Sequence, residues 1–249
     1  MKKKMEIVER SAVLSDIHFD DADERAVALA MRFLRYFKPD NIFLNGDIID
    51  NYAVSRHPKH PHRKRSLDGD IKRTKSFFKE LRTDHPKSRI VFVHGNHCWR
   101  LERYIIDQSP ELYNFTTLND ILRPKDLNIE TVSSIHKENW FKYRDLHIGH
   151  FDKITGNAAS TAQSLIRDRG VSVIQGHAHR VGMTAKTFLD RTLFGYENPC
   201  LCSLDPDYVN YPNWQHGFTL IFADKKTTWV YPIVIKDYSF IWDGKKWRG

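Results

Sequence analysis

Five short polar groups follow apolar runs along this chain. They read SDIH, NGDIID, HGNH, HIGH and GHAH, and each contains residue types that bind metal ions. Because the carboxyl ends of parallel strands meet at one edge of a sheet, groups placed after strands can converge in the fold. The sequence therefore predicts a metal site built from distant segments, and its candidate ligands are Asp16, His18, Asp47, Asn96, His150, His177 and His179.

The apolar periodicity predicts alternating strands and helices in the first two-thirds of the chain. Strands are predicted over residues 12–14, 42–44, 90–93, 129–132, 140–143, 146–148 and 171–174. Helices are predicted over residues 22–37, 67–81, 99–106 and 157–169, with short helical turns in 107–128. The last seventy residues are rich in β-type segments, such as 219–222 and 229–231. This order favours two sheets packed face to face, with helices outside them.

The spacing within the groups predicts how their side chains are aimed. Residues two apart in an extended segment point the same way, so Asp16 and His18 are expected to face one cation. The same geometry is expected for His177 and His179. Asp47 follows a glycine, which permits close backbone approach, and its two oxygens can bridge two cations. Mixed imidazole and carboxylate ligands suit manganese, iron or zinc.

Two assignments have alternatives. His147 competes with His150 as the ligand in LHIGH, but His150 follows a glycine at the end of the predicted strand, and alternation puts His147 on the opposite face. Cys200 and Cys202 could bind a metal as a pair, or they could be two residues on one face of a strand. The absence of a second thiol or histidine pair nearby favours the strand.

The chain has 249 residues, three cysteines and a net charge of +8. We expect one domain over residues 1–249, with the motifs in 9–185 and a β-rich part in 186–249. The few cysteines, the lack of an apolar segment behind the basic start, and the lack of a membrane-length apolar run indicate a cytoplasmic protein without a membrane partner. The positive charge favours polyanionic partners such as nucleic acid, although it is also consistent with simple solubility.

The ordered set D-x-H, G-D-x-x-D, G-N-H, a later histidine and G-H-x-H resembles the calcineurin-like metallophosphoesterase superfamily, over roughly residues 9–185. The resemblance implies a four-layer α/β/β/α sandwich and two divalent metal ions, with manganese expected before iron, zinc or nickel. It implies ligands Asp16, His18, Asp47 and His179 for the first metal. For the second metal it implies Asp47, Asn96, His150 and His177.

The resemblance also implies a mechanism. A hydroxide bridging the metals would attack phosphorus in line. His97 would protonate the leaving oxygen or stabilise charge in the transition state, and Asp50 would orient its ring. The chain departs from the family at Cys98, where many relatives have Asp or Glu after G-N-H, and at Asn51 and Tyr52, where the protein phosphatases have Arg-Gly. The second departure weakens a protein phosphatase assignment.

The substrate is less well specified than the chemistry. A basic segment over residues 56–65, which contains His57 and Arg63, is expected near the site, and Arg100 and Arg103 follow His97 on a predicted helix. All four are candidate phosphate-binding residues, with ordinary surface charge as the alternative. Residues 205–216 are aromatic and turn-rich, and could form a lip on which a base stacks or could simply pack between strands.

These features together predict a metal-dependent phosphodiesterase that acts on nucleic acid or nucleotides, with a phosphate ester as its partner. The alternative is a phosphomonoesterase acting on a nucleotide, a phosphoprotein or a small metabolite. A non-catalytic scaffold with the same fold is a minor alternative, because the ligand set is complete. The oligomeric state is not specified by the sequence.

Overall fold

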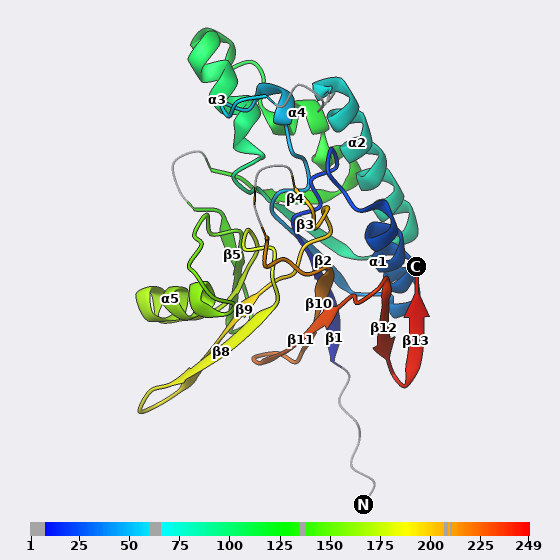
Figure 1. Ribbon diagram of the computed structural model, residues 1–249, viewed down its shortest axis with the longest axis vertical. Coiled ribbons are helices and arrows are strands. Elements are labelled where there is room, and N and C mark those ends of the chain that lie inside the picture. The colour runs from blue at the N-terminus through cyan, green and yellow to red at the C-terminus, as the bar shows by residue number, and fades with distance from the viewer. Residues whose placement is uncertain (1–7, 60–65, 135–137, 207–208, 210) are drawn as a thin grey trace, which may run out of the picture.

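The computed structural model describes residues 8–59, 66–134, 138–206, 209 and 211–249. Its first sheet has the order β11-β10-β1-β2-β3-β4 (Figure 1). The strands are β1 (Glu9–Leu14), β2 (Asn41–Asn45), β3 (Arg89–Val93), β4 (Ile129–Val132), β10 (Gly217–Ala223) and β11 (Thr228–Val234). Strands β1 to β4 run parallel to one another, whereas β10 and β11 pair antiparallel. The C-terminal part of the chain therefore completes the sheet that the first strands begin.

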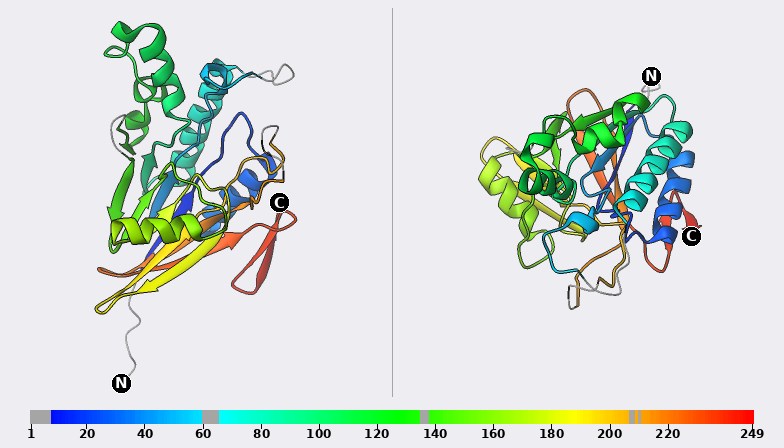
Figure 2. Two further views of the ribbon diagram at one scale, coloured as in Figure 1. Left: turned by 60° about the vertical axis from the view of Figure 1, so that its left-hand side comes forward. Right: turned by 90° about the horizontal axis from the view of Figure 1, so that it is seen from above.

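The second sheet has the order β5-β6-β7-β9-β8. Its strands are β5 (Trp140–Tyr143), β6 (Leu146–Gly149), β7 (Ser172–Gln175), β8 (Gly182–Thr187) and β9 (Thr192–Glu197). The central strands β6, β7 and β9 are parallel, and β5 and β8 pair antiparallel at the two edges. The β8–β9 hairpin extends well away from the rest of the molecule (Figures 1 and 2).

Helices cover the outer faces of the sheets. Helices α1 (Glu24–Phe37) and α2 (Leu67–Asp84) lie over the first sheet, and α5 (Ser160–Arg169) lies over the second (Figure 2). The elements η1 (Tyr52–Val54), α3 (Trp99–Gln108), η2 (Pro110–Leu112), α4 (Leu118–Leu122) and η3 (Pro124–Leu127) occupy the connections after β2 and β3. A final hairpin of β12 (Ser239–Trp242) and β13 (Lys245–Arg248) lies beside α1.

Helix α1 shows how local sequence sets the element boundaries. The Asp23 side chain accepts hydrogen bonds from the backbone N–H groups of Arg25 and Ala26, which satisfies donors that a helix start leaves unpaired. The helix ends at Lys38, which adopts a left-handed conformation immediately before Pro39. Its buried side is apolar throughout. These signals explain why the sequence predicts this helix to within two residues.

Three apolar layers separate the four structural layers. Along β1, Ala12 and Leu14 pack toward the helices, whereas Val13 faces the second sheet. The alternation is the pleat of a strand that is buried on both faces. Leu165 and Ile166 of α5 pack with Val173 of β7 in the third layer. The predicted four-layer α/β/β/α sandwich is confirmed.

The sequence-based assignment of the helices and strands named above is confirmed, with boundaries shifted by a few residues. The hairpins β8–β9 and β12–β13 were expected only as generally β-rich sequence. Within the part of the chain that the structure describes, no helix has both the length and the apolar character needed to cross a membrane.

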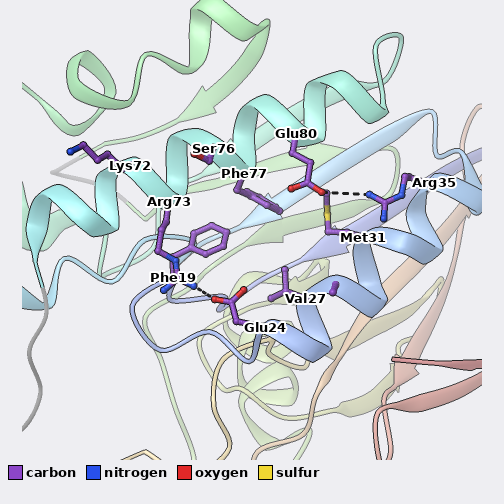
Figure 3. Close-up of a pocket in the computed structure, with 11 residues that line it drawn as sticks. Phe19, Glu24, Val27, Met31, Arg35, Lys72, Arg73, Ser76, Phe77 and Glu80 are labelled. Carbon is purple, nitrogen blue, oxygen red and sulfur yellow. Dashed lines mark hydrogen bonds and ion pairs between the residues drawn. The ribbon is translucent and has the colours of Figure 1, made fainter.

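A pocket of about 410 Å³ lies between α1 and α2 (Figure 3). Apolar side chains of Phe19, Val27, Met31 and Phe77 line it. Ion pairs join the two helices across it, between Arg73 and Glu24 and between Arg35 and Glu80. None of the candidate metal ligands lines this pocket.

Candidate metal centre

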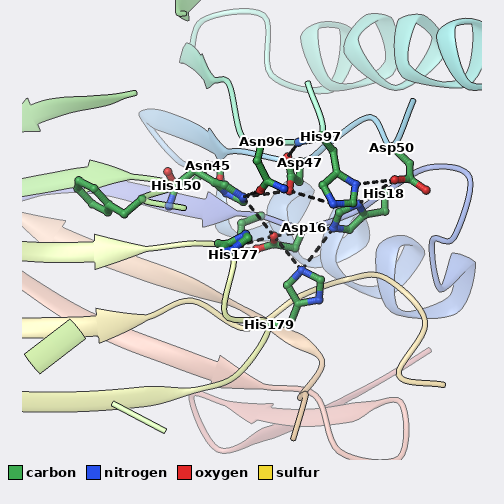
Figure 4. Close-up of polar contacts among 12 residues, drawn as sticks. Asp16, His18, Asn45, Asp47, Asp50, Asn96, His97, His150, His177 and His179 are labelled. Carbon is green, nitrogen blue, oxygen red and sulfur yellow. Dashed lines mark hydrogen bonds and ion pairs between the residues drawn. The ribbon is translucent and has the colours of Figure 1, made fainter. Parts of the chain in front are cut away.

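The predicted ligands come together at the carboxyl ends of parallel strands from both sheets (Figure 4). Asp16 follows β1, Asp47 follows β2 and Asn96 follows β3 in the first sheet. His150 follows β6 and His177 follows β7 in the second sheet. The facing sheets therefore bring five separate segments to one place, as expected for ligands placed after parallel strands.

The backbone at these residues is not extended, so the predicted extended geometry is wrong. Asp16 and His18 have φ values of 53° and 48°, and His177 and His179 have values of 67° and 58°. Non-glycine residues rarely adopt this left-handed region, and such strain concentrates at functional sites. Backbone hydrogen bonds hold the first turn, because Asp16 N donates to Gly46 O at 3.1 Å and His18 N donates to Asp47 O at 2.9 Å.

Glycines make room for the ligands. Gly46 has φ +86°, and a side chain there would collide with the His150 ring. A side chain at Gly95 would collide with the carboxylate of Asp47. The close packing expected around Asp47 therefore requires glycine at both Gly46 and Gly95.

The first group of ligands surrounds Asp16. Ligand atoms of Asp16, His18 and Asp47 lie within 4.8 Å of one another. His179 Nε2 lies 3.1 Å from Asp16 Oδ1 and 3.4 Å from His18 Nε2. Three of the four residues are under 3% exposed and His179 is 5% exposed, so the group is shielded from solvent.

The second group shares Asp47 with the first. Ligand atoms of Asp47, His150 and His177 also lie within 4.8 Å of one another. His150 Nε2 is 3.0 Å from Asp47 Oδ2 and 3.1 Å from Asn96 Oδ1. Asp47 Oδ2 is buried, and its close neighbour is this imidazole nitrogen. A buried carboxylate oxygen surrounded by imidazole nitrogens fits a divalent cation, so this donor set suits the two ions implied by the sequence.

The charges of the group support one another. Burial raises the pKa of Asp16, but His179 and His150 outweigh it and bring the pKa to about 2. Burial also acts to raise the pKa of Asp47, and the charges of His150 and His97 hold it well below its ordinary value. Burial lowers the pKa of His150, but Asp47 and Asp16 raise it to about 10. In the metal-free protein a proton on His150 therefore compensates the two carboxylates.

His97 and Asp50 form a pair beside the ligands. His97 Nδ1 lies 2.5 Å from Asp50 Oδ1, and the backbone N–H of His97 donates to Asp47 Oδ1 at 2.8 Å. Arg100, one turn further along, donates to the Asp50 carboxylate and lies 2.9 Å from His97 Nε2. Both ring nitrogens of His97 are thus engaged. Ligand-type atoms of His97, Asp50 and His18 also lie within 4.8 Å of one another.

Of the alternative residues, His147 lies elsewhere, whereas ligand atoms of Cys202, His18 and His179 lie within 4.8 Å of one another. His147 stacks on Trp140, with ring centroids 4.3 Å apart, and is not part of the ligand groups. Cys200 and Cys202 are buried and take part in isolated bridges rather than a regular strand. Cys202 Sγ lies 3.6 Å from His179 Nδ1, on the opposite side of the ring from Asp16.

The substrate-binding candidates differ in their relation to this centre. Arg100 contacts it directly, as described above. Arg103 is exposed, and its charge acts on Asp152, whose pKa is raised by burial. His57 is exposed and donates its backbone N–H to Ser55 Oγ at 3.2 Å. Arg63 lies outside the described residues.

Trp214 was not singled out from the sequence, although it lies in the aromatic segment 205–216. Its ring centroid is 4.3 Å from that of His179. The signal in the sequence was the aromatic character of the segment. The contact itself joins residues 35 positions apart and could not be read from spacing.

Comparison with known proteins agrees with this geometry. A family model described as calcineurin-like phosphoesterase matches residues 10–192. The Gene 54 proteins of Mycobacterium phages L5 and D29 are 23% and 26% identical to this chain, covering 96% of it and 98% of each of those proteins. The Vps29 structure from Cryptosporidium parvum superimposes with a TM-score of 0.49 at 9% identity, covering 97% of this chain and 95% of that one. The ligand groups described here would serve metal-dependent chemistry on phosphate esters. The chain belongs to the calcineurin-like phosphoesterase family.

Proposed function

We propose that this protein is a metal-dependent phosphodiesterase that acts on nucleotides or nucleic acid. The observation that carries the proposal is the pair of ligand groups that share Asp47, beside the His97–Asp50–Arg100 network. Family membership supports phosphate ester hydrolysis. The narrower choice of a diester follows from the charges near the site.

Asp16, His18, Asp47 and His179 would hold one divalent cation, and Asp47, Asn96, His150 and His177 the other. Two bound cations supply a nucleophile at neutral pH and neutralise charge on the phosphoryl oxygens. Manganese is the expected metal, with iron, zinc and nickel as alternatives. The protein's own contribution is to fix these ligands in a buried, preorganised arrangement.

The state of His97 defines what it can do. Burial lowers its pKa to about 4, so the ring is neutral in the free protein. With Nδ1–H donated to Asp50, Nε2 accepts a hydrogen bond from Arg100. An arriving phosphate would draw the Arg100 guanidinium away and would raise the pKa of His97. The ring would then take a proton from solvent at Nε2 and could give it to the leaving oxygen.

The charge balance supports a diester. A phosphodiester carries one negative charge, whereas a monoester carries up to two. The guanidinium that contacts the site, that of Arg100, is already paired with Asp50. The net charge of +8 supports a polyanionic partner, with exposed Arg103 and His57 as candidate contacts.

The proposal is tested by turnover of bis-(p-nitrophenyl) phosphate against p-nitrophenyl phosphate, in the presence of manganese. The diester is expected to have the higher kcat/KM. Preference for the monoester would replace the proposal with a phosphomonoesterase. If the protein bound manganese but hydrolysed neither ester, the scaffold alternative would be favoured.

Nucleic acid as the substrate is tested separately by salt dependence. Binding of single-stranded DNA to the manganese-loaded protein is expected to weaken steeply as salt rises, because counterions are released from phosphates. An affinity that is independent of salt would exclude polynucleotides as substrates and would leave small nucleotides as the substrate class.

A further inference from the structure

Trp214 lies beside the candidate metal centre without being a candidate ligand. Its ring centroid is 4.3 Å from that of His179, at an interplanar angle of 57°. The side chain is only partly buried, whereas His179 is 5% exposed. The indole is therefore the solvent-facing neighbour of a buried ligand.

The backbone next to Trp214 is firmly anchored. Gln215 N donates to His179 O at 2.9 Å, and the Gln215 side-chain oxygen accepts from Val181 N at 3.0 Å. Cys200 N donates to Gln215 O at 3.1 Å. Two of these hydrogen bonds fix Gln215 to the segment that carries His179, and the third fixes it to Cys200. Together they set the indole at the site before any substrate arrives.

Trp214 contacts the His179 ring, and His97 contacts the His18 ring. The His18 ring is 4.4 Å from the His97 ring and 5.2 Å from the His179 ring, measured between centroids. Figure 4 shows His97 and His179 on opposite sides of His18. A leaving oxygen that takes its proton from His97 therefore departs on the side away from His179, the ring that Trp214 contacts. The ester group that stays on phosphorus can extend toward the indole.

We propose that Trp214 is a stacking platform for the base of the nucleotide that remains on phosphorus after cleavage. The inference rests on the proposed function and narrows its substrate class to esters with a flat aromatic group on the retained side. Every base has a π-face, and stacking on an aromatic side chain is tolerant of sequence. The partly exposed indole beside a cation-binding centre provides such a face.

The first test compares two ligands that share a phosphate and differ in the base, namely adenosine 5′-monophosphate and ribose 5-phosphate. Their binding to the full manganese-loaded chain is measured by calorimetry. We expect the nucleotide to bind about tenfold more tightly, the factor contributed by one base–aromatic contact. Trp214→Leu is expected to abolish this difference, and Trp214→Phe to retain most of it.

The matched control is Trp229→Leu, which removes a more exposed indole, at 44%, from β11. This variant should behave like the wild-type protein. Equal affinity of the wild-type protein for the two ligands would overturn the proposal, as would absence of binding by the nucleotide. A Trp214→Leu variant that weakened both ligands equally, or lost manganese, would show instead that Trp214 only supports His179.

A kinetic test separates this inference from the proposed activity. Bis-(p-nitrophenyl) phosphate, methyl p-nitrophenyl phosphate and p-nitrophenyl phosphate share one leaving group and differ in the retained group. Trp214→Leu should raise KM about tenfold for the first ester and leave the other two unchanged. Selective nucleotide binding without turnover of any ester would refute the proposed phosphodiesterase activity but would support the role of Trp214 in base stacking. Turnover with an unchanged KM ratio would refute the platform alone.

Discussion

Replacing His97 with asparagine tests the proton-donor role of this imidazole. Asparagine can keep a hydrogen bond to Asp50 but cannot carry the proton. In the free protein, burial lowers the pKa of His97 to about 4, so about one molecule in a thousand holds the imidazolium at pH 7. Forming that acid costs about 4 kcal/mol, which the negative charge of a bound substrate must offset.

The size of the effect should depend on the leaving group. General acid catalysis contributes about 10² to 10⁴ in rate when the leaving group is a poor one. We expect His97→Asn to lower turnover of a thymidine dinucleotide by this factor. The p-nitrophenyl ester of thymidine 5′-monophosphate keeps the same retained nucleotide, but its leaving group needs no proton, and its turnover should fall by less than about tenfold.

The assay compares these two esters with the wild-type and variant proteins, together with their manganese content. Metal content should not change, because both ring nitrogens of His97 are already engaged by Asp50 and Arg100. Equal loss of turnover for both esters would refute the role as proton donor. Loss of metal would show that His97 is a ligand.

Three further predictions follow from the same contacts. Arg100→Met should raise KM for phosphate diesters by about tenfold or more, because one charge-assisted contact with the substrate is lost. Steady-state kinetics measures this change, and an unchanged KM would mean that Arg100 contacts Asp50 but not the substrate. Manganese binding at pH 8 should release at least one proton per chain, because His150 has a pKa of about 10 in the metal-free protein and must lose its proton to bind. Calorimetry in buffers of different ionisation enthalpy measures this release, and no release would contradict the assignment of His150. Glu197→Gln should destabilise the fold by about 3–5 kcal/mol in urea unfolding, because it leaves the buried Arg180 guanidinium without its charged partner. The control is Glu130→Gln, which breaks the exposed ion pair with Arg89 and should cost less than about 1 kcal/mol. Similar costs for the two variants would refute the argument from burial.

Much of the fold could be predicted because its signals are local. Helix α1 has a capping aspartate at one end, a proline after the other and an apolar face between them. Strands β1, β2 and β3 are short apolar runs, and the groups that follow them had to meet if those strands were parallel neighbours. The convergence of Asp16, Asp47 and Asn96 was therefore accessible from order alone.

The local geometry of the site was not accessible in this way. Alternation predicted an extended Asp16–His18 segment, but hydrogen bonds to the turn after β2 hold both residues in the left-handed region. Such tertiary hydrogen bonds override local preference, and strain of this kind is tolerated where the surrounding structure fixes it. The side chains still converge, although by a different backbone route.

Contacts made across the chain were also beyond reach. His97 and Arg100 are three residues apart at the start of α3, so their proximity could have been predicted from helical spacing. The engagement of Arg100 with Asp50 required the turn after β2 to be placed against that helix. The contact of Trp214 with His179 depends on hydrogen bonds made by Gln215 to two distant segments.

The central claim is that two divalent cations share Asp47 at the carboxyl ends of the strands. Elemental analysis of the purified chain, after loading with manganese and removal of free metal, tests it most directly. The account predicts two manganese ions per wild-type chain and a marked loss in Asp47→Asn, whose bridging charge is gone. A wild-type chain that retained no metal would contradict the account, and so would an Asp47→Asn chain that retained both ions.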